Sequence, residues 1–316
     1  MKKQNKFVRF ALVFIVIIPL FLSSCSSDDI GSLTFPLSAD IHNSVDDKQV
    51  AFQGLSHSSV SWSWDFGDGT TSAEQNPVHV YADGGYYTVV FTSTDANGNQ
   101  ETDEVELAIA LTPYTLLTGG PTAVNGKTWK LSASHSTNGD YFAWANADFS
   151  PFEDTPAPLP DGAFNLFLNM PEVYDDEFTF HFDGSYEIDV KDGTAFSGLI
   201  YQFFTTGGAG IVNDGGADFG LCTGLYTPEA DATFTYVAEE DFMNPSVFGA
   251  IVYSGVSTLD FSDTGYVGFL DFQRKVIVQE VNDTTMKMVI FASLDPDAAG
   301  AGLSTHGLVL TFEVVK

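Results

Sequence analysis

The 316-residue chain is strongly acidic, with 42 Asp and Glu residues against 12 Lys and Arg residues and a formal net charge of −30 at pH 7. Such a surface repels nucleic acid and anionic lipid, so the composition excludes nucleic-acid binding. It also disfavours strongly anionic glycans as ligands, unless a local basic or calcium-bridged patch overrides the global field. Aromatic residues make up 14 % of a chain rich in Gly, Asn and Asp, which is typical of short β-strands joined by tight turns.

The N-terminal segment predicts export from the cytoplasm. Lys2, Lys3, Lys6 and Arg9 form a basic region, and an apolar run follows from Phe10 to Leu22. This run is too short to span a bilayer comfortably, so residues 1–24 are predicted to be a signal peptide.

The four residues "LSSC" that end at Cys25 resemble a bacterial lipobox. The resemblance implies cleavage before Cys25 and attachment of diacylglycerol to its thiol, so that the mature chain is held in a membrane by its lipid and residues 25–35 form a tether. The following "SSDD" resembles the acidic export signal of lipoproteins displayed on the outer face of the outer membrane. The alternative is an ordinary signal peptide followed by a coincidental cysteine.

Only one other cysteine, Cys222, is present, so the mature protein has no intramolecular disulfide and depends on core packing. Cys222 lies in an apolar, Gly-rich stretch and is predicted to be a small buried residue.

Residues 36–110 alternate with the period of β-strands and are interrupted by turns. The stretches "WDFGDGTTS" and "NPVHVYADGGYYTVVFTSTDANG" and the closing "DEVEL" resemble the signature of a PKD domain. The resemblance implies a seven-stranded immunoglobulin-like sandwich that serves as a spacer. Within the motif, Gly67 and Gly69 permit turn dihedrals, Asp65 and Asp68 cap the turn, and Trp64 is predicted to lie in the core.

Residues 111–124 have no sustained period and are predicted to be a linker. From residue 125 to the C-terminus the alternation returns, with no long amphipathic helical pattern, and Trp129 is expected in the core. The expected fold is therefore all-β: an immunoglobulin-like PKD sandwich followed by a jelly-roll-like β-sandwich over residues 125–316.

The stretch "DEFTFHFDGSYEIDVKDG" predicts a hairpin with an apolar face. Its return strand carries Glu187, Asp189 and Asp192 in an E-x-D-x-x-D spacing, close to the E-x-D-x-x-E motif of family 16 glycoside hydrolases. A retaining glycosidase needs two facing carboxylates, but Asp192 is one methylene too short and sits in an Asp-Gly turn. The spacing therefore favours an ordinary solvated sheet face, and no other catalytic arrangement is evident, so the protein is predicted not to be an enzyme.

The segments "GKTWKL", "VYDDEFTFHFDGSYEIDV" and "VIVQEVNDTTMKMVI" resemble the C-terminal domain of PKD-bearing surface glycan-binding lipoproteins. That resemblance implies binding of a polysaccharide, with a neutral β-glucan such as laminarin as the best guess, without cleavage. It also implies a TonB-dependent outer-membrane importer and that importer's lipoprotein partner as partners.

An irregular stretch after the first strand of this domain contains "DYFAWANAD" and is the predicted glycan site. Tyr141 and Trp144 are the expected ring platforms, while Asn146 and Asp148 are the expected partners of sugar hydroxyls. The alternative is that Trp144 anchors this loop onto the sandwich.

Three other possibilities stay open from the sequence. The chain could be an adhesin or structural lipoprotein without a glycan site, or a family 16-like hydrolase. Jelly-roll glycan-binding modules also commonly carry one structural Ca²⁺, but no continuous Ca²⁺ loop is present from which to assign its ligands.

Overall fold

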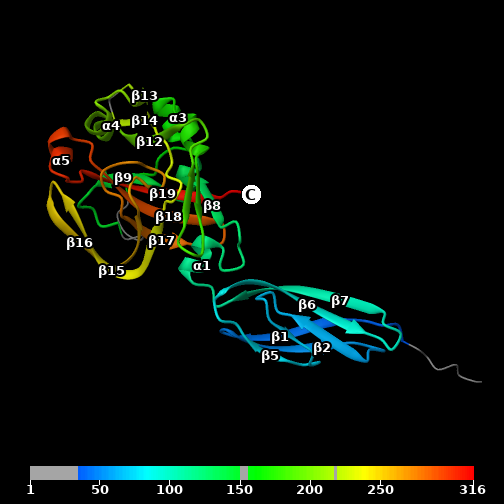
Figure 1. Cartoon of the computed structure of the whole chain (residues 1–316). Helices are drawn as coiled ribbons and strands as arrows, with labels where there is room; N and C mark the ends of the chain where they lie inside the picture. Colours follow the sequence, from blue (N-terminus) through cyan, green and yellow to red (C-terminus); the bar gives the residue numbers. More distant parts are fainter. Residues whose placement is uncertain (1–34, 150–155, 217–218) are drawn as a thin grey trace, which may run out of the picture. The chain divides into compact units, whose positions relative to one another are not determined.

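The computed structural model describes residues 35–149, 156–216 and 219–316 (Figure 1). The expected signal peptide, the expected lipidation site Cys25 and nearly all of the expected tether lie outside the described residues. Residues 37–316 form one compact unit. In the described part of the chain, no helix combines the length and apolarity needed to cross a membrane.

The first seven strands form two sheets around their own core. One sheet has the order β1-β2-β5 and the other β4-β3-β6-β7. The strands are β1 (Asp40–Asp46), β2 (Gln49–Leu55), β3 (Ser61–Asp65), β4 (Thr71–Ser72), β5 (Val78–Val80), β6 (Gly85–Thr94) and β7 (Gln100–Ile109). Buried residues from both sheets, including Phe52, Trp64 and Phe91, fill the space between them. The expected immunoglobulin-like sandwich is confirmed.

The turn after β3 has the expected local cause. Asp65 accepts a hydrogen bond from the Gly67 N–H (2.9 Å), and Asp68 accepts one from the Thr70 N–H (3.0 Å). Gly67 has φ +77°, and a β-carbon there would lie 2.5 Å from the carbonyl oxygen of Thr88. Glycine is therefore required at this position both by dihedral and by space.

The second part of the chain is built on a nine-stranded antiparallel sheet. Its order is β11-β10-β8-β19-β18-β17-β16-β15, and β9 also pairs with β19. The strands are β8 (Lys127–Leu131), β9 (Tyr141–Trp144), β10 (Glu177–Phe180), β11 (Tyr186–Asp189), β15 (Phe234–Ser246), β16 (Gly249–Phe261), β17 (Val276–Val281), β18 (Thr285–Ala292) and β19 (His306–Val314). With the immunoglobulin-like sandwich before it, this sheet confirms the predicted all-β fold and the β-sandwich of the second domain.

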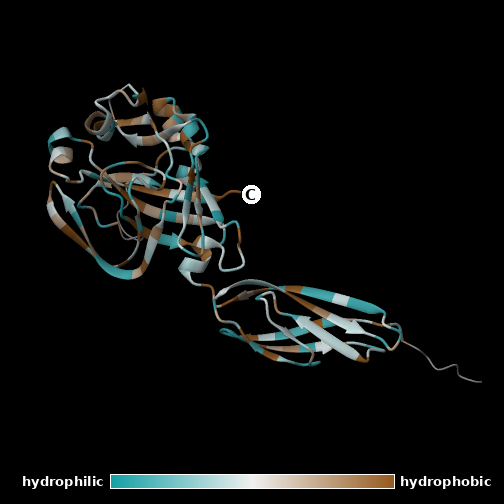
Figure 2. Ribbon diagram, in the orientation of Figure 1, coloured by the Kyte–Doolittle hydropathy of each residue, from teal (hydrophilic) through white to brown (hydrophobic). Residues whose placement is uncertain are grey.

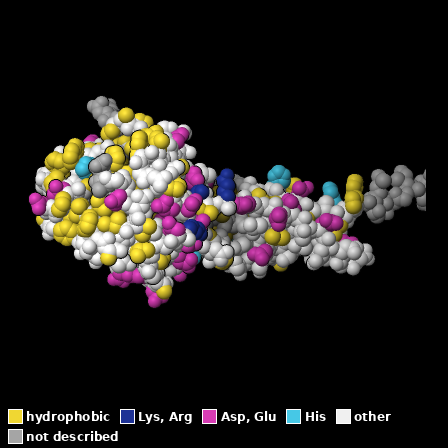
Figure 3. All heavy atoms as spheres, turned by 90° about the horizontal axis from the view of Figure 1, so that it is seen from above, with side chains coloured by type: hydrophobic (Ala, Val, Ile, Leu, Met, Phe, Trp, Pro, Cys, Tyr) yellow, Lys and Arg dark blue, Asp and Glu magenta, His cyan; other side chains and the backbone are white. Residues whose placement is uncertain are grey.

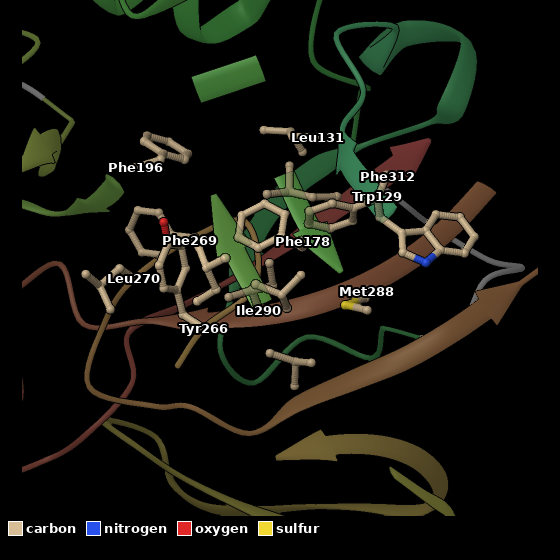
Figure 4. Packing of buried hydrophobic residues seen from close by; sticks show 14 of the residues in the cluster. Trp129, Leu131, Phe178, Phe196, Tyr266, Phe269, Leu270, Met288, Ile290 and Phe312 are labelled. Atoms are coloured by element: carbon tan, nitrogen blue, oxygen red, sulfur yellow. The ribbon is translucent and has the colours of Figure 1, made fainter. Parts of the chain in front are cut away.

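The large sheet curls so that its two end strands meet. The Tyr186 N–H donates to the carbonyl of Ala232 (2.9 Å), and the Phe234 N–H donates to the carbonyl of Gly184 (3.0 Å). The inner face therefore closes around one large apolar cluster, part of which is shown in Figure 4.

Both faces of the sheet are buried near its centre. On β18, Met286, Met288 and Ile290 point into the large cluster, whereas Val289 and Phe291 join a second cluster on the opposite face. This two-sided burial agrees with the brown stretches on the central strands in Figure 2, where consecutive residues are hydrophobic.

The long β15–β16 ribbon covers the second face because it bends. Its pairing register shifts between Val237 and Glu240 and again before Phe242. Beyond these irregularities, Phe242 and Tyr253 lie with their ring centroids 5.8 and 5.6 Å from that of Phe291. Bulges of this kind bend a ribbon and increase its twist.

A smaller sheet and several short helices complete the domain. The sheet has the order β12-β14-β13. Its strands are β12 (Thr194–Gly198), β13 (Ile211–Asn213) and β14 (Leu221–Leu225), and the helices are α1 (Pro113–Thr118), α2 (His135–Asn138), α3 (Ala163–Leu168), η1 (Pro171–Tyr174), α4 (Leu199–Thr206) and α5 (Pro296–Gly300).

The segment expected as a linker contributes to the core. Leu117 on α1 is 1 % exposed, and its carbonyl accepts a hydrogen bond from the indole of buried Trp129 (2.9 Å). One six-residue helix is too short to show a hydrophobic period, so the sequence pattern did not reveal it.

The acidic hairpin has the expected two faces. Phe178 and Phe180 are buried, while the side chain of Glu187 is 73 % exposed. Asp189 pairs with Lys191 on the exposed face, and Asp192 accepts a hydrogen bond from the Thr194 N–H (2.9 Å). These acids are a solvated strand face and a turn cap.

Candidate ligand-binding site

Trp144 lies on a strand, not on the loop that the sequence suggested. It ends β9, and its direct cross-strand partner on β19 is His306. The two rings stack, with centroids 4.4 Å apart and planes inclined by 28°. Trp144 remains 58 % exposed although His306 stacks on its indole, so part of the ring stays accessible to a ligand.

A third ring comes from the turn of the β15–β16 ribbon. Phe248 and Trp144 make a T-shaped contact, with ring centroids 5.9 Å apart and planes at 79°. The turn is fixed by backbone hydrogen bonds to the segment before β19: the Val247 N–H donates to the carbonyl of Ser304 (3.1 Å), and the Ser304 N–H donates to the carbonyl of Pro245 (2.9 Å). The aromatic group is therefore preorganised by the sheet.

Trp144 and His306 open onto a pocket of about 810 Å³. Its polar side chains are Asn146 and His306, and the other lining residues are Phe142, Ala143, Trp144, Ala147, Pro156, Leu199, Ile200, Phe219, Gly220, Leu221 and Leu294. The wall opposite β9 comes from the start of α4, which is held in place by a hydrogen bond from the Leu199 N–H to the carbonyl of Gly220 (2.8 Å). Hydrophobic side chains also gather over much of the surface of residues 113–316 that faces the viewer in Figure 3.

The pocket is electrically neutral near its platform. Burial lowers the pKa of His306, so its imidazole is uncharged at neutral pH. Its Nδ1 lies 2.9 Å from the hydroxyl of Thr305. The uncharged imidazole of His306 therefore adds no charge beside the flat, apolar indole of Trp144. The exposed amide of Asn146 lines the same pocket and can form hydrogen bonds with a ligand.

The four predicted ligand residues separate into three places. Trp144 and Asn146 share the large pocket. Asp148 instead lines a second pocket of about 440 Å³, together with Tyr253 on β16 and Gln279 on β17. Tyr141 is only 5 % exposed within the second apolar cluster, so its ring faces are taken by core neighbours.

The assignment of Tyr141 as a platform is therefore wrong, for a simple reason. Successive side chains of a strand point alternately to its two faces. Tyr141 and Trp144 are three residues apart, so they point to opposite faces and cannot both face the pocket. Sequence reasoning treated this stretch as a loop and so placed no such restriction on it.

Sequence reasoning also missed His306, Phe248 and Phe219. His306 begins a strand and Phe248 sits in a hairpin turn, and each looks unremarkable in its own segment. The register of β9 with β19 brings His306 to Trp144, and backbone hydrogen bonds between the ribbon turn and Ser304 place Phe248 beside it. No local sequence pattern encodes these long-range pairings.

The sequence left open whether a structural Ca²⁺ is bound. In residues 35–149, 156–216 and 219–316 there is no group of three or more His, Cys, Asp or Glu placed to hold a metal ion. Buried Cys222 has a pKa raised to about 12 by burial, so its thiol stays protonated and unreactive at neutral pH.

Comparison with known proteins identifies the first domain. Residues 39–109 match the family model of the PKD domain. The chain is 43 % identical over 56 residues to collagenase ColA of Bacillus cereus, covering 18 % of this chain and 6 % of that protein. It is 35 % identical over 81 residues to the pre-pro-metalloprotease PrtV of Vibrio cholerae, covering 26 % of this chain and 9 % of that protein.

Two solved structures are also similar. The PKD1 domain of Vibrio cholerae PrtV is 31 % identical and covers 24 % of this chain and all of that structure, with a TM-score of 0.24. A carbohydrate-binding module of the β-sandwich superfamily is 12 % identical and covers 90 % of this chain and 93 % of that one, with a TM-score of 0.25. A likeness at that score carries no argument about a ligand.

The N-terminal domain is thus a PKD domain, as its motifs indicated. The chain spans less than a tenth of the length of the curated relatives that it matches.

Proposed function

We propose that this protein binds a neutral polysaccharide through the Trp144 pocket and does not cleave it. A sugar ring presents a flat C–H face that stacks on an aromatic side chain, and its hydroxyls take hydrogen bonds from amides. The single observation that carries the proposal is the exposed, ring-supported indole of Trp144 at the mouth of a pocket of about 810 Å³.

The charge of the chain narrows the class of glycan. The acidic chain, with a net charge of −30, repels polyanions such as alginate and pectin. The pocket itself offers uncharged groups at neutral pH, since His306 is held neutral. Neutral glucans are not repelled by the acidic chain and match the uncharged groups of the pocket. Among them, laminarin is chosen because of the family resemblance.

Binding without cleavage agrees with the positions of the hairpin acids. Glu187 and Asp189 are on an exposed sheet face, and Asp189 is neutralised by Lys191. Asp192 caps a turn instead of facing a partner across a cleft. A retaining glycosidase needs two carboxyl groups about 5 Å apart on either side of a bound sugar.

The setting proposed for this activity is the cell surface. A lipid on Cys25 would hold the chain in the outer membrane, and the PKD domain would act as a spacer. Capture of the polymer would then raise its local concentration for a TonB-dependent importer and that importer's lipoprotein partner.

Trp144→Ala is expected to weaken glycan binding at least about tenfold, which corresponds to ~1.4 kcal/mol. Removal of the indole takes away both the platform and its contact with His306. The measurement is affinity electrophoresis of residues 37–316 through gels that contain laminarin, xylan, mannan, alginate or pectin, with reducing ends assayed in parallel.

Met243→Ala is the matched control, because Met243 is 61 % exposed and lies outside the Trp144 pocket. Retardation by a neutral glycan that Trp144→Ala abolishes and Met243→Ala preserves would support the proposal. No retardation on any gel would favour an adhesin or structural role. Release of reducing ends that is lost in Glu187→Gln would establish a hydrolase.

A further inference from the structure

A smaller apolar cavity of about 170 Å³, open to solvent at Phe167 and Phe219, adjoins the Trp144 pocket. All eight of its lining residues are hydrophobic: Phe142, Leu159, Ala163, Phe164, Phe167, Leu168, Phe219 and Leu221. We call it the Phe142 cavity. An unsubstituted glycan is not expected to occupy this cavity, because a sugar hydroxyl placed there would lose its hydrogen bonds to water without gaining others.

The Phe142 cavity and the Trp144 pocket are continuous. Phe142, Phe219 and Leu221 line both of them. A ligand seated on Trp144 therefore has an apolar space beside it, within reach of a substituent on the same molecule.

The cavity is held open by its surroundings. α3 supplies Ala163, Phe164 and Leu168, and it is tied down by a hydrogen bond from the Phe164 N–H to the hydroxyl of Tyr174 (3.1 Å). The Phe164 ring also packs edge-on against buried His135, with centroids 5.1 Å apart. Because these anchors lie outside the cavity, an occupant would enter a preformed space at little ordering cost.

The size and the walls of the cavity indicate its occupant. A dry cavity of about 150 Å³ lined by Leu, Ile and Phe takes up one benzene molecule. Here four of the eight walls are phenylalanine rings, and the Phe142 and Phe164 rings lie 6.1 Å apart at 25°. Aromatic rings at such spacings gain from offset or edge-on contact with a further ring, which an alkyl chain does not provide to the same extent.

We propose that the ligand of the Trp144 pocket carries an aryl group, and that this ring inserts into the Phe142 cavity. The chemical class is an aryl ester or aryl glycoside of a neutral sugar, with no hydrogen-bonding group on the inserted part of the ring. The sugar half of this inference rests on the proposed function, whereas the aryl half rests on the cavity alone.

The test separates the two halves by using probes without sugar. Saturation-transfer NMR on residues 37–316 with benzyl alcohol and with 1-hexanol measures the cavity by itself. Benzyl alcohol is expected to bind more tightly than hexanol. Ala163→Leu, which fills the cavity, is expected to weaken the binding of benzyl alcohol at least fivefold.

Phe219→Ser provides a second variant that does not depend on repacking a buried site, since Phe219 is 56 % exposed. It is expected to weaken benzyl alcohol binding, while Met243→Ala is expected to have no effect. Equal saturation transfer in the unmodified protein and in both cavity variants would overturn the inference, as would hexanol binding as tightly as benzyl alcohol.

A comparison of phenyl β-D-glucopyranoside with methyl β-D-glucopyranoside joins the two halves. The phenyl compound is expected to bind at least fivefold more tightly, and Ala163→Leu is expected to remove that difference. If benzyl alcohol binds at the cavity but no glycan is retained by the gels, the proposed function fails and the aryl site stands. If a glycan is retained but benzyl alcohol does not bind, the aryl inference alone is overturned.

Discussion

His135→Ala is expected to lower the free energy of unfolding of the second domain by about 3 kcal/mol. His135 and Asp140 are both completely buried, with His135 Nδ1 2.8 Å from a carboxylate oxygen of Asp140 and Nε2 2.9 Å from the hydroxyl of Tyr174. Thr311 donates to the other oxygen of Asp140 (2.6 Å). Removal of the imidazole leaves a buried carboxylate and a half-buried phenol without this partner.

One arrangement of protons satisfies the whole group. The Phe164 N–H donates to the Tyr174 oxygen, the Tyr174 hydroxyl donates to His135 Nε2, and His135 Nδ1–H donates to Asp140. The network thus joins the segment after β8 to η1, α3 and β19. Because it also holds α3, it supports one wall of the Phe142 cavity.

The measurement is urea unfolding of residues 37–316 followed by tryptophan fluorescence. Tyr174→Phe removes only the hydroxyl and is expected to cost about 1 kcal/mol, and the double variant is expected to cost less than the sum of the two. Val124→Ala, at a position that is 85 % exposed, is the control and is expected to change stability by less than about 0.5 kcal/mol. A loss below about 1 kcal/mol in His135→Ala would show that the network contributes little.

Asp176→Asn is expected to stabilise the protein by about 2 kcal/mol at pH 8. Asp176 is 4 % exposed, and burial raises the pKa of its carboxyl to about 8, with repulsion from Asp192 as the second cause. A buried carboxyl of this kind resists ionisation, and an amide of the same shape carries no charge to bury.

The pH dependence follows from the direction of the shift. The folded protein holds the Asp176 proton up to a pH of about 8, whereas the unfolded chain releases it near its ordinary value of 3.8. Between these values the folded state binds more protons, so this carboxyl makes the protein less stable as the pH rises from about 4 to about 8. The advantage of Asp176→Asn is therefore expected to be largest at pH 8 and absent near pH 3.5.

Urea unfolding at pH 3.5, 6 and 8 tests this expectation. Asp260→Asn serves as the control because Asp260 is exposed on β16 and its change to an amide removes the same charge. A gain of equal size in both variants would mean that the global reduction of negative charge, and not the burial of Asp176, is responsible. A gain that does not change with pH would also contradict the assignment.

Strand alternation and turn chemistry determined much of the fold in advance. The burial of Tyr186 and Ile188 on either side of exposed Glu187 followed from the period of two, because the side chains of a half-buried strand have only two directions to take. The turn with Gly67 and its Asp caps was also predictable from the sequence, because the glycine and the capping carboxylates that form it lie within a few residues of one another.

The tertiary structure alone decided the site. Trp144 and His306 are 162 positions apart, and only the pairing of β9 with β19 stacks their rings. That pairing also makes Tyr141 a core residue and Trp144 an exposed one, although the two looked equivalent in one aromatic stretch. Local composition specifies which residues prefer burial or a turn, whereas a binding surface depends on which distant strands share an edge and in what register, a choice made by the packing of the whole sheet.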